Sequence, residues 1–163
     1  TTFEVADNAL DPLGLPMSTY TPRTTLLLQH LQTRLQTLTV AGGYRTNVGN
    51  NVSLEREQAQ DADAPLASVR MLSFEYSDGQ VLPERTCQVQ IEVAVPCTVA
   101  NAGPEVAEAI EDVFELFRVP TSVALTTGVE AYIATAESAA LERPETAIAV
   151  LAQIGLVAVI SEP

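Results

Sequence analysis

The nine residues "CQVQIEVAV" (87–95) decide the fold, because apolar and polar side chains alternate along them without a break. Successive side chains of a strand point to opposite faces of the sheet. One face therefore carries Cys87, Val89, Ile91, Val93 and Val95, and the other carries Gln88, Gln90 and Glu92. This pattern predicts a strand with one face in the core and one face in water.

Further strands are predicted on both sides of this one. Residues 68–76 have a stranded pattern, and the Asp78-Gly79 turn signal joins them to the strand starting near Arg85 as a wide hairpin. Residues 44–54 alternate weakly and predict a short strand or ribbon, and residues 128–137 predict another strand. The last run, 146–160, ends in an almost wholly apolar stretch, which is typical of a strand in the middle of a sheet or covered on both faces.

Two amphipathic helices are predicted. The first opens with Thr21 as N-cap and Pro22 in the first turn, and Gly42 and Gly43 stop it. Its apolar stripe is Leu28, Leu31, Leu35 and Leu38. The second opens near residues 101–104 and ends at Pro120, with its acidic residues expected away from the apolar stripe of Val106, Ile110, Val113, Phe114 and Phe117.

These elements predict an α+β fold, with a mostly antiparallel sheet of four to six strands and two amphipathic helices packed on one face. Residues 1–20 show no periodicity and contain two prolines and a glycine, so they predict an extended N-terminal arm. Residues 21–163 then form a single domain, which is an ordinary length for one core.

The segment "AGGYRTNVGNN" (41–51) resembles a phosphate-binding loop in composition only. Such a loop lies between a strand and a helix and ends in Lys-Ser or Lys-Thr, whereas this segment follows a helix and the chain has no lysine. We therefore predict a helix stop and a turn, with Tyr44 and Val48 toward the core and Arg45 and the asparagines outward. No cofactor is expected here.

The sequence gives only weak indications of catalytic or metal-binding residues elsewhere in the chain. His30 is the sole histidine and flanks the leucine stripe, which indicates a residue at the core boundary rather than a catalytic base. Cys87 and Cys97 lie about 30 Å apart on one extended strand, so we expect unpaired, buried thiols. Asp61 and Asp63 lack the remaining ligands of a calcium loop and predict a solvated acidic loop. No catalytic residue and no metal site is expected, although a carboxylate-based enzyme stays open.

The net charge of the chain is strongly negative. The sequence has twenty-one acidic residues and eight cationic residues, all of them arginine, for a formal charge of −13. Affinity for nucleic acid comes from neutralising phosphates, so this charge argues against wrapping DNA but allows DNA to pass nearby. Few charged residues and many apolar ones favour self-association. Arginine suits planar pairing with carboxylates at fixed interfaces, although codon bias in a GC-rich genome also explains a chain whose cations are all arginine. No signal peptide or membrane span is apparent, so we expect a cytoplasmic origin.

The order of elements resembles the tail-terminator proteins of long-tailed bacteriophages, the minor tail protein U type. The residues that carry this resemblance are the helix "TPRTTLLLQHLQTRLQTL" followed by "GGYRTNVGNNV", then an acidic loop, a hairpin returning as "CQVQIEVAV", an acidic helix and an apolar final strand. The resemblance covers about residues 20–160, and the helix followed by GY-R-T-x-V-G is its most telling part.

The resemblance implies a structural virion protein without enzymatic activity. Members of the family form a hexameric ring that caps the tail tube, ends its polymerisation and provides the surface for head attachment. The implied partners are other copies of the chain, the tail-tube protein and the head-tail connector proteins, with DNA passing through without sequence-specific binding. Candidate interface residues are Arg45, Asn47, Arg56, Glu57, Asp61 and Asp63.

Two alternatives stay open at this point. One is another neck or head-tail joining ring, assembled in the bacterial host cytoplasm and carried in the virion like a terminator. The other is a domain that binds a small molecule or catalyses a reaction through the 42–51 loop.

Overall fold

The computed structural model describes residues 22–54, 65–77, 84–97, 102–126, 128–136, 138–142 and 149–161. The predicted N-terminal arm (1–20) and the Asp78-Gly79 turn lie outside this part of the chain. So do four of the candidate interface residues, Arg56, Glu57, Asp61 and Asp63.

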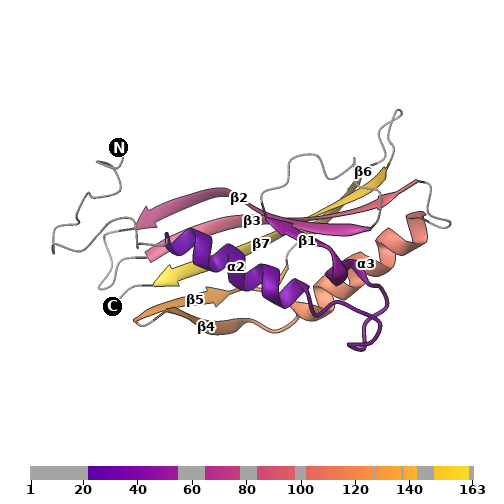
Figure 1. The fold of residues 1–163 in the computed structure, drawn as a ribbon. Coiled ribbons are helices and arrows are strands. Elements are labelled where there is room, and N and C mark those ends of the chain that lie inside the picture. Colours follow the sequence, from indigo (N-terminus) through magenta and orange to yellow (C-terminus); the bar gives the residue numbers. More distant parts are fainter. Residues whose placement is uncertain are drawn as a thin grey trace, which may run out of the picture.

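Within the described residues, seven strands form one curled sheet in the order β1-β2-β3-β7-β5-β4, and β6 also pairs with β7 (Figure 1). All pairs are antiparallel except β1 with β2. The strands are β1 (Val52–Leu54), β2 (Leu66–Ser77), β3 (Glu84–Pro96), β4 (Thr121–Thr126), β5 (Val129–Ile133), β6 (Ser138–Glu142) and β7 (Ala149–Ser161). The α+β class and the mostly antiparallel sheet are confirmed, although the sheet has seven strands and the prediction was four to six.

The long strands β3 and β7 form the centre of the sheet. They pair over their full length, from Glu84 opposite Ser161 to Pro96 opposite Ala149. The five apolar side chains predicted for the core face of β3 are all buried. On the other face Gln88 is exposed, but Gln90 is only 7% exposed, and the Arg70 guanidinium on β2 donates to its side-chain oxygen. The prediction of a uniformly wet face is therefore wrong at Gln90.

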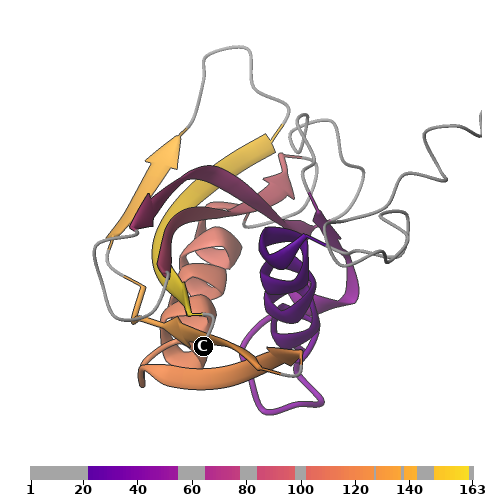
Figure 2. The same cartoon turned by 90° about the vertical axis from the view of Figure 1, so that its left-hand side faces the viewer.

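The two helices are α2 (Arg23–Leu35) and α3 (Ala102–Leu116). Figure 2 shows them side by side within the curl of the sheet. Helix α2 contacts β1, β2 and β4, and α3 contacts β3 and β7. The predicted leucine stripe of α2 is buried, as are Val106, Val113 and Phe117 of the stripe predicted for α3.

The ends of the first helix differ from the prediction. Pro22 occupies the N-cap position and makes no side-chain cap bond. At the other end α2 stops at Leu35 and not at Gly42, because the chain turns sharply through residues 36–43 with the Thr37 hydroxyl donating to the Arg34 carbonyl. Leu38 is still fully buried although it lies outside the helix.

Three shorter segments were also misread. Residues 44–54 form a turn, a 3-10 helix η2 (Val48–Asn50) and only then the three-residue β1. β4 was missed because "TSVALT" alternates only weakly, and β6 was missed because the polar link predicted from Glu142 to Glu145 begins inside it, at its last residue. Both strands are short and depend on pairing with β5 and β7.

Cys87 and Cys97 form no disulfide with each other, as predicted. Cys87 is buried on the core face of β3, and burial raises the pKa of its thiol. Cys97 is exposed just beyond the end of β3, so the prediction of a buried thiol is wrong there. The strand ends at Pro96, which leaves the next residue outside the sheet.

Candidate functional site: the Arg45–Asp112 junction

The segment 41–51 is held against helix α3 by local turns. Gly43 has a φ of 97°, a left-handed conformation that glycine adopts without strain. The Gly49 N–H donates to the Leu38 carbonyl at 2.8 Å, which folds the 3-10 turn back onto the end of α2. Val48 is fully buried and Tyr44 packs against the core, so both predicted orientations are confirmed.

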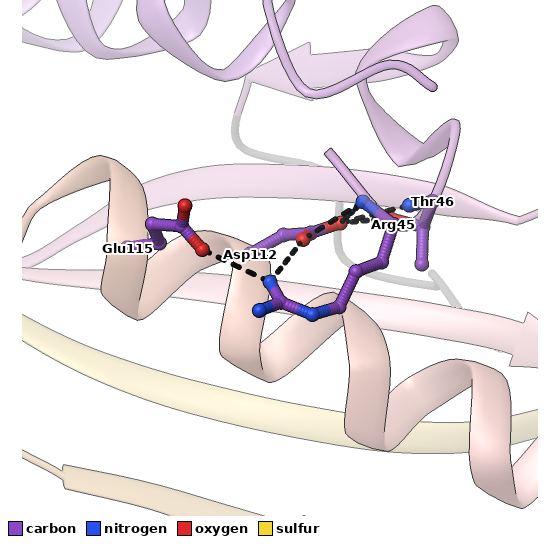
Figure 3. A network of polar contacts seen from close by, with 4 residues as sticks. All are labelled: Arg45, Thr46, Asp112 and Glu115. Carbon is purple, nitrogen blue, oxygen red and sulfur yellow. Dashed lines mark hydrogen bonds and ion pairs between the residues drawn. The ribbon is translucent and has the colours of Figure 1, made fainter. Parts of the chain in front are cut away.

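A buried carboxylate on α3 accepts hydrogen bonds from this segment (Figure 3). Asp112 is completely buried. Its Oδ2 accepts from the Thr46 N–H at 2.9 Å and from the Thr46 hydroxyl at 2.8 Å. The Arg45 N–H lies 3.1 Å from Oδ1 and 3.2 Å from Oδ2. A buried charge is stable only when such donors replace its water.

The guanidinium of Arg45 completes this set of contacts. We call the set, which consists of Arg45, Thr46, Asp112 and Glu115, the junction (Figure 3). Its Nη1 lies 3.1 Å from Asp112 Oδ1 and 3.0 Å from Glu115 Oε2, one helical turn further along α3. Hydrogen bonds to Glu115 and then to Asp112 raise the pKa of Arg45. The Arg45 and Glu115 side chains are about half exposed, so water screens that ion pair more than the buried one.

A second arginine joins the two helices nearby. Arg34, in the last turn of α2, donates from Nη2 to the Leu116 carbonyl at 2.9 Å, at the end of α3. A cation beside a helix C-terminus is favourable because it interacts with the unpaired carbonyls. The guanidinium also lies 4.6 Å from the Phe117 ring centroid, a cation-π distance. Burial lowers the pKa of Arg34.

A surface pocket of about 390 Å³ lies beside the junction. Its lining combines one cation, two acids and several amides: Arg45, Thr46, Asn47, Asn50, Asn51, Pro65, Glu105 and Glu108. Because Arg45 is already paired with two carboxylates, the pocket offers a phosphate no unpaired cation of its own. The arrangement suits neutral or polar groups that can bond to asparagine amides.

The structure brings together two of the predicted site residues. Arg45 and Asn47 both line this pocket, but both also hold the turn, since Asn47 Oδ1 accepts from the Val40 N–H at 2.9 Å. Asp112 was missed, and the prediction that the acidic residues of α3 avoid its core side is wrong at this position. In "EAIEDVFEL" nothing distinguishes Asp112 from Glu111; the signal lies 66 residues away, in donors that only the fold brings close.

His30 lies at the boundary of α2 and the core, as predicted, and it is partly buried. Its Nε2 is buried and has no hydrogen-bond partner among the described residues. Burial, and then the positive charge of Arg34, lower the pKa of His30 below its ordinary value of 6.5. Protonated imidazole is therefore disfavoured in the folded protein.

This pKa shift predicts a pH dependence of stability. The unfolded chain takes up a proton near pH 6.5 and the folded chain only at lower pH, so the stabilisation is complete above pH 6.5 and is lost as pH falls below it. The slope approaches about 1.4 kcal/mol per pH unit for one proton. Urea unfolding between pH 7 and pH 5.5 measures it. His30→Gln should flatten the slope in this window, and an identical slope in the variant would contradict the assignment.

The fold and the junction together define an α+β domain in which a buried carboxylate on one helix fixes the turn that follows the other. None of the helices within the described residues is long and apolar enough to cross a membrane. No protein-family model matches the chain, and no curated protein matches it.

Proposed function

We propose that the chain is a phage tail terminator, a structural virion protein that forms a ring on the tail tube and ends its polymerisation. The observation that carries the proposal is the junction. The segment GY-R-T-x-V-G, through which the sequence resembles tail terminators, is fixed to α3 by Asp112 and is a structural element of the domain. A motif used in this way suits an assembly protein better than a cofactor-binding one.

In the subunit of the proposed ring, we place both helices, α2 and α3, on the same face of the sheet. Side chains of α2 and α3 join one core cluster with the alternate β3 residues that begin with Cys87 and Val89. A separate small cluster of Leu66, Ala94 and Leu151 occupies the other set of strand positions. The second face, which also carries the exposed Gln88 and Tyr132, is then available to neighbouring subunits and to the tube.

The charge of the outer side of α3 supports a lumen role. Glu108, Glu111 and Glu115 are exposed along one side of this helix. If α3 lines the ring, these carboxylates repel DNA phosphates, so the genome slides through without the contacts that cause sticking. A ring whose lumen proved basic would rule out this part of the proposal.

Tube polymerisation tests the function. The purified chain is added in increasing amounts to polymerising tail-tube protein of the same phage, and tube lengths are measured by electron microscopy. We expect the mean length to fall as the ratio of the chain to the tube protein rises. An acidic protein of similar mass is the control. Unchanged lengths, with the chain bound only to head-tail connectors, would favour the alternative of another neck ring.

A further inference from the structure

The two edges of the sheet are formed by different strands, and much of each edge has no further described strand paired with it. At one edge β1 pairs with β2 only along residues 67–69, so the longer part of β2 has no strand beyond it among the described residues. On the opposite side of the sheet β4 pairs with β5 alone, and the short β6 pairs with β7 alone. In Figure 1 β2 lies at the top of the sheet and β4 at the bottom. Strands with unpaired N–H and C=O groups are templates for another strand.

Exposed apolar side chains occur on and near these edges. Among the described residues, five large apolar side chains are exposed. Leu72 and Phe74 lie on β2 itself, Val119 lies in the turn just before β4, and Tyr132 lies on β5, next to β4. The fifth, Val40, lies in the turn after α2. The β2 edge therefore carries two exposed apolar side chains that a strand beside it would contact.

Neither edge strand contains lysine or proline, which natural edge strands use to prevent pairing. A β-bulge is another such device, and β2 has one. β4 has no charged residue and no proline, and the chain has no lysine. β2 has a bulge between Met71 and Ser73, but its register with β3 is regular again along residues 73–77. β4 has a register shift of its own, between Ala124 and Thr126, so its regular part is residues 121–124, close in length to that of β2.

The charges at the two edges are complementary in one orientation. Arg118 is exposed just before β4, and Glu75 is exposed near the end of β2. Antiparallel pairing of β2 with β4 of another copy brings these two ends together. It also brings Glu130, on β5 opposite Ala124, toward the end of the edge that carries Arg70. Parallel pairing would separate both sets of charges.

From these features we propose that the β2 edge of one copy, residues 72–77, pairs antiparallel with β4 of the next copy and continues the sheet from subunit to subunit. The two edges differ and lie at opposite ends of the sheet, so the contact is head-to-tail, and a head-to-tail contact closes into a ring when its rotation allows. The inference rests on the proposed ring function and names the surface that builds the ring.

The test uses one blocked edge at a time in the full chain. Leu72→Lys with Phe74→Lys blocks β2, and Ser122→Lys with Ala124→Lys blocks β4; all four positions are exposed. Sedimentation velocity measures the mass. We expect the wild type to be a multimer, each blocked protein a 17.4 kDa monomer, and their equimolar mixture a heterodimer that grows no further. Val40→Lys, an exposed apolar position that lies on neither edge strand, is the control and should keep the wild-type mass.

Other outcomes overturn the inference. A homodimer of the β4-blocked protein would mean that β2 edges pair with each other. A wild-type mass in both blocked proteins would leave the ring standing but assign it to another surface. A monomeric wild type would exclude edge pairing, whereas the tube-length assay decides the terminator function independently.

A charge exchange tests the same contact if a lysine variant does not fold. Glu75→Arg and Arg118→Glu each reverse one exposed charge, so each alone should shift the equilibrium toward monomer. The double variant should restore the wild-type mass, because the attraction is re-formed with opposite signs. Failure of the double variant to recover any of the loss would contradict the antiparallel orientation.

Discussion

Asp112→Ala is expected to lower the free energy of unfolding by about 2–5 kcal/mol, because it removes the shared acceptor of several hydrogen bonds at a fully buried position. The substitution leaves the N–H groups of Arg45 and Thr46 without their acceptor in a buried place. Each unsatisfied donor costs about 1–3 kcal/mol. Urea or guanidinium unfolding followed by circular dichroism measures the loss.

Two variants separate the buried charge from the exposed one. Asp112→Asn keeps the shape, but its amide NH₂ must face other donors in either orientation, so we expect a large part of the same loss. Glu115→Ala removes the half-exposed partner of the same guanidinium and should cost only about 0–1 kcal/mol. Equal losses for Asp112→Ala and Glu115→Ala would contradict the described junction.

Gly49→Ala is expected to cost about 2–4 kcal/mol, at or above the usual range for overpacking. A methyl group on Gly49 would lie 2.6 Å from the Leu35 carbonyl oxygen and 2.8 Å from the N and O atoms of Leu38. These are backbone atoms, so no side-chain rotation relieves the contact. The turn that places Arg45 and Thr46 against Asp112 would have to move.

A second glycine in the same segment is the matched control. Gly43 has a positive φ, but no atom lies within 4 Å of the position that its Cβ would take. Asparagine tolerates this conformation, so Gly43→Asn should change the unfolding free energy by less than about 1 kcal/mol. A Gly49→Ala protein as stable as Gly43→Asn would show that the 3-10 turn packs less closely than described.

The sequence predicts the elements whose burial pattern is local. The strand β3 and the leucine stripe of α2 were found because their own side chains repeat with the period of a strand or a helix. β7 was found from its continuous apolar run. The pairing of β2 with β3 was found from the stranded patterns on either side of a turn signal. Strand pairing that joins distant segments was not predicted, and β4 and β6, which depend on it, were missed.

The junction was also missed because it depends on a contact between segments that are distant in the sequence. Glycine content pointed to the 41–51 segment, and the residue types correctly argued against a phosphate loop. Its actual partner, Asp112, belongs to a helix whose acidic residues all appeared to be surface residues. Asp112 differs from the other four acidic residues of α3 only because the helix packs against the turn at this position. The spacing of residues along the sequence does not reveal that contact.

The central claim, that this chain caps a tail tube as a ring, is tested most directly by electron cryo-microscopy of tubes assembled with the wild-type protein. The account predicts a closed ring of this chain at one end of each tube, with an open channel and the acidic side of α3 toward it. Tubes with bare ends, beside a chain that stays monomeric in the same sample, would contradict it.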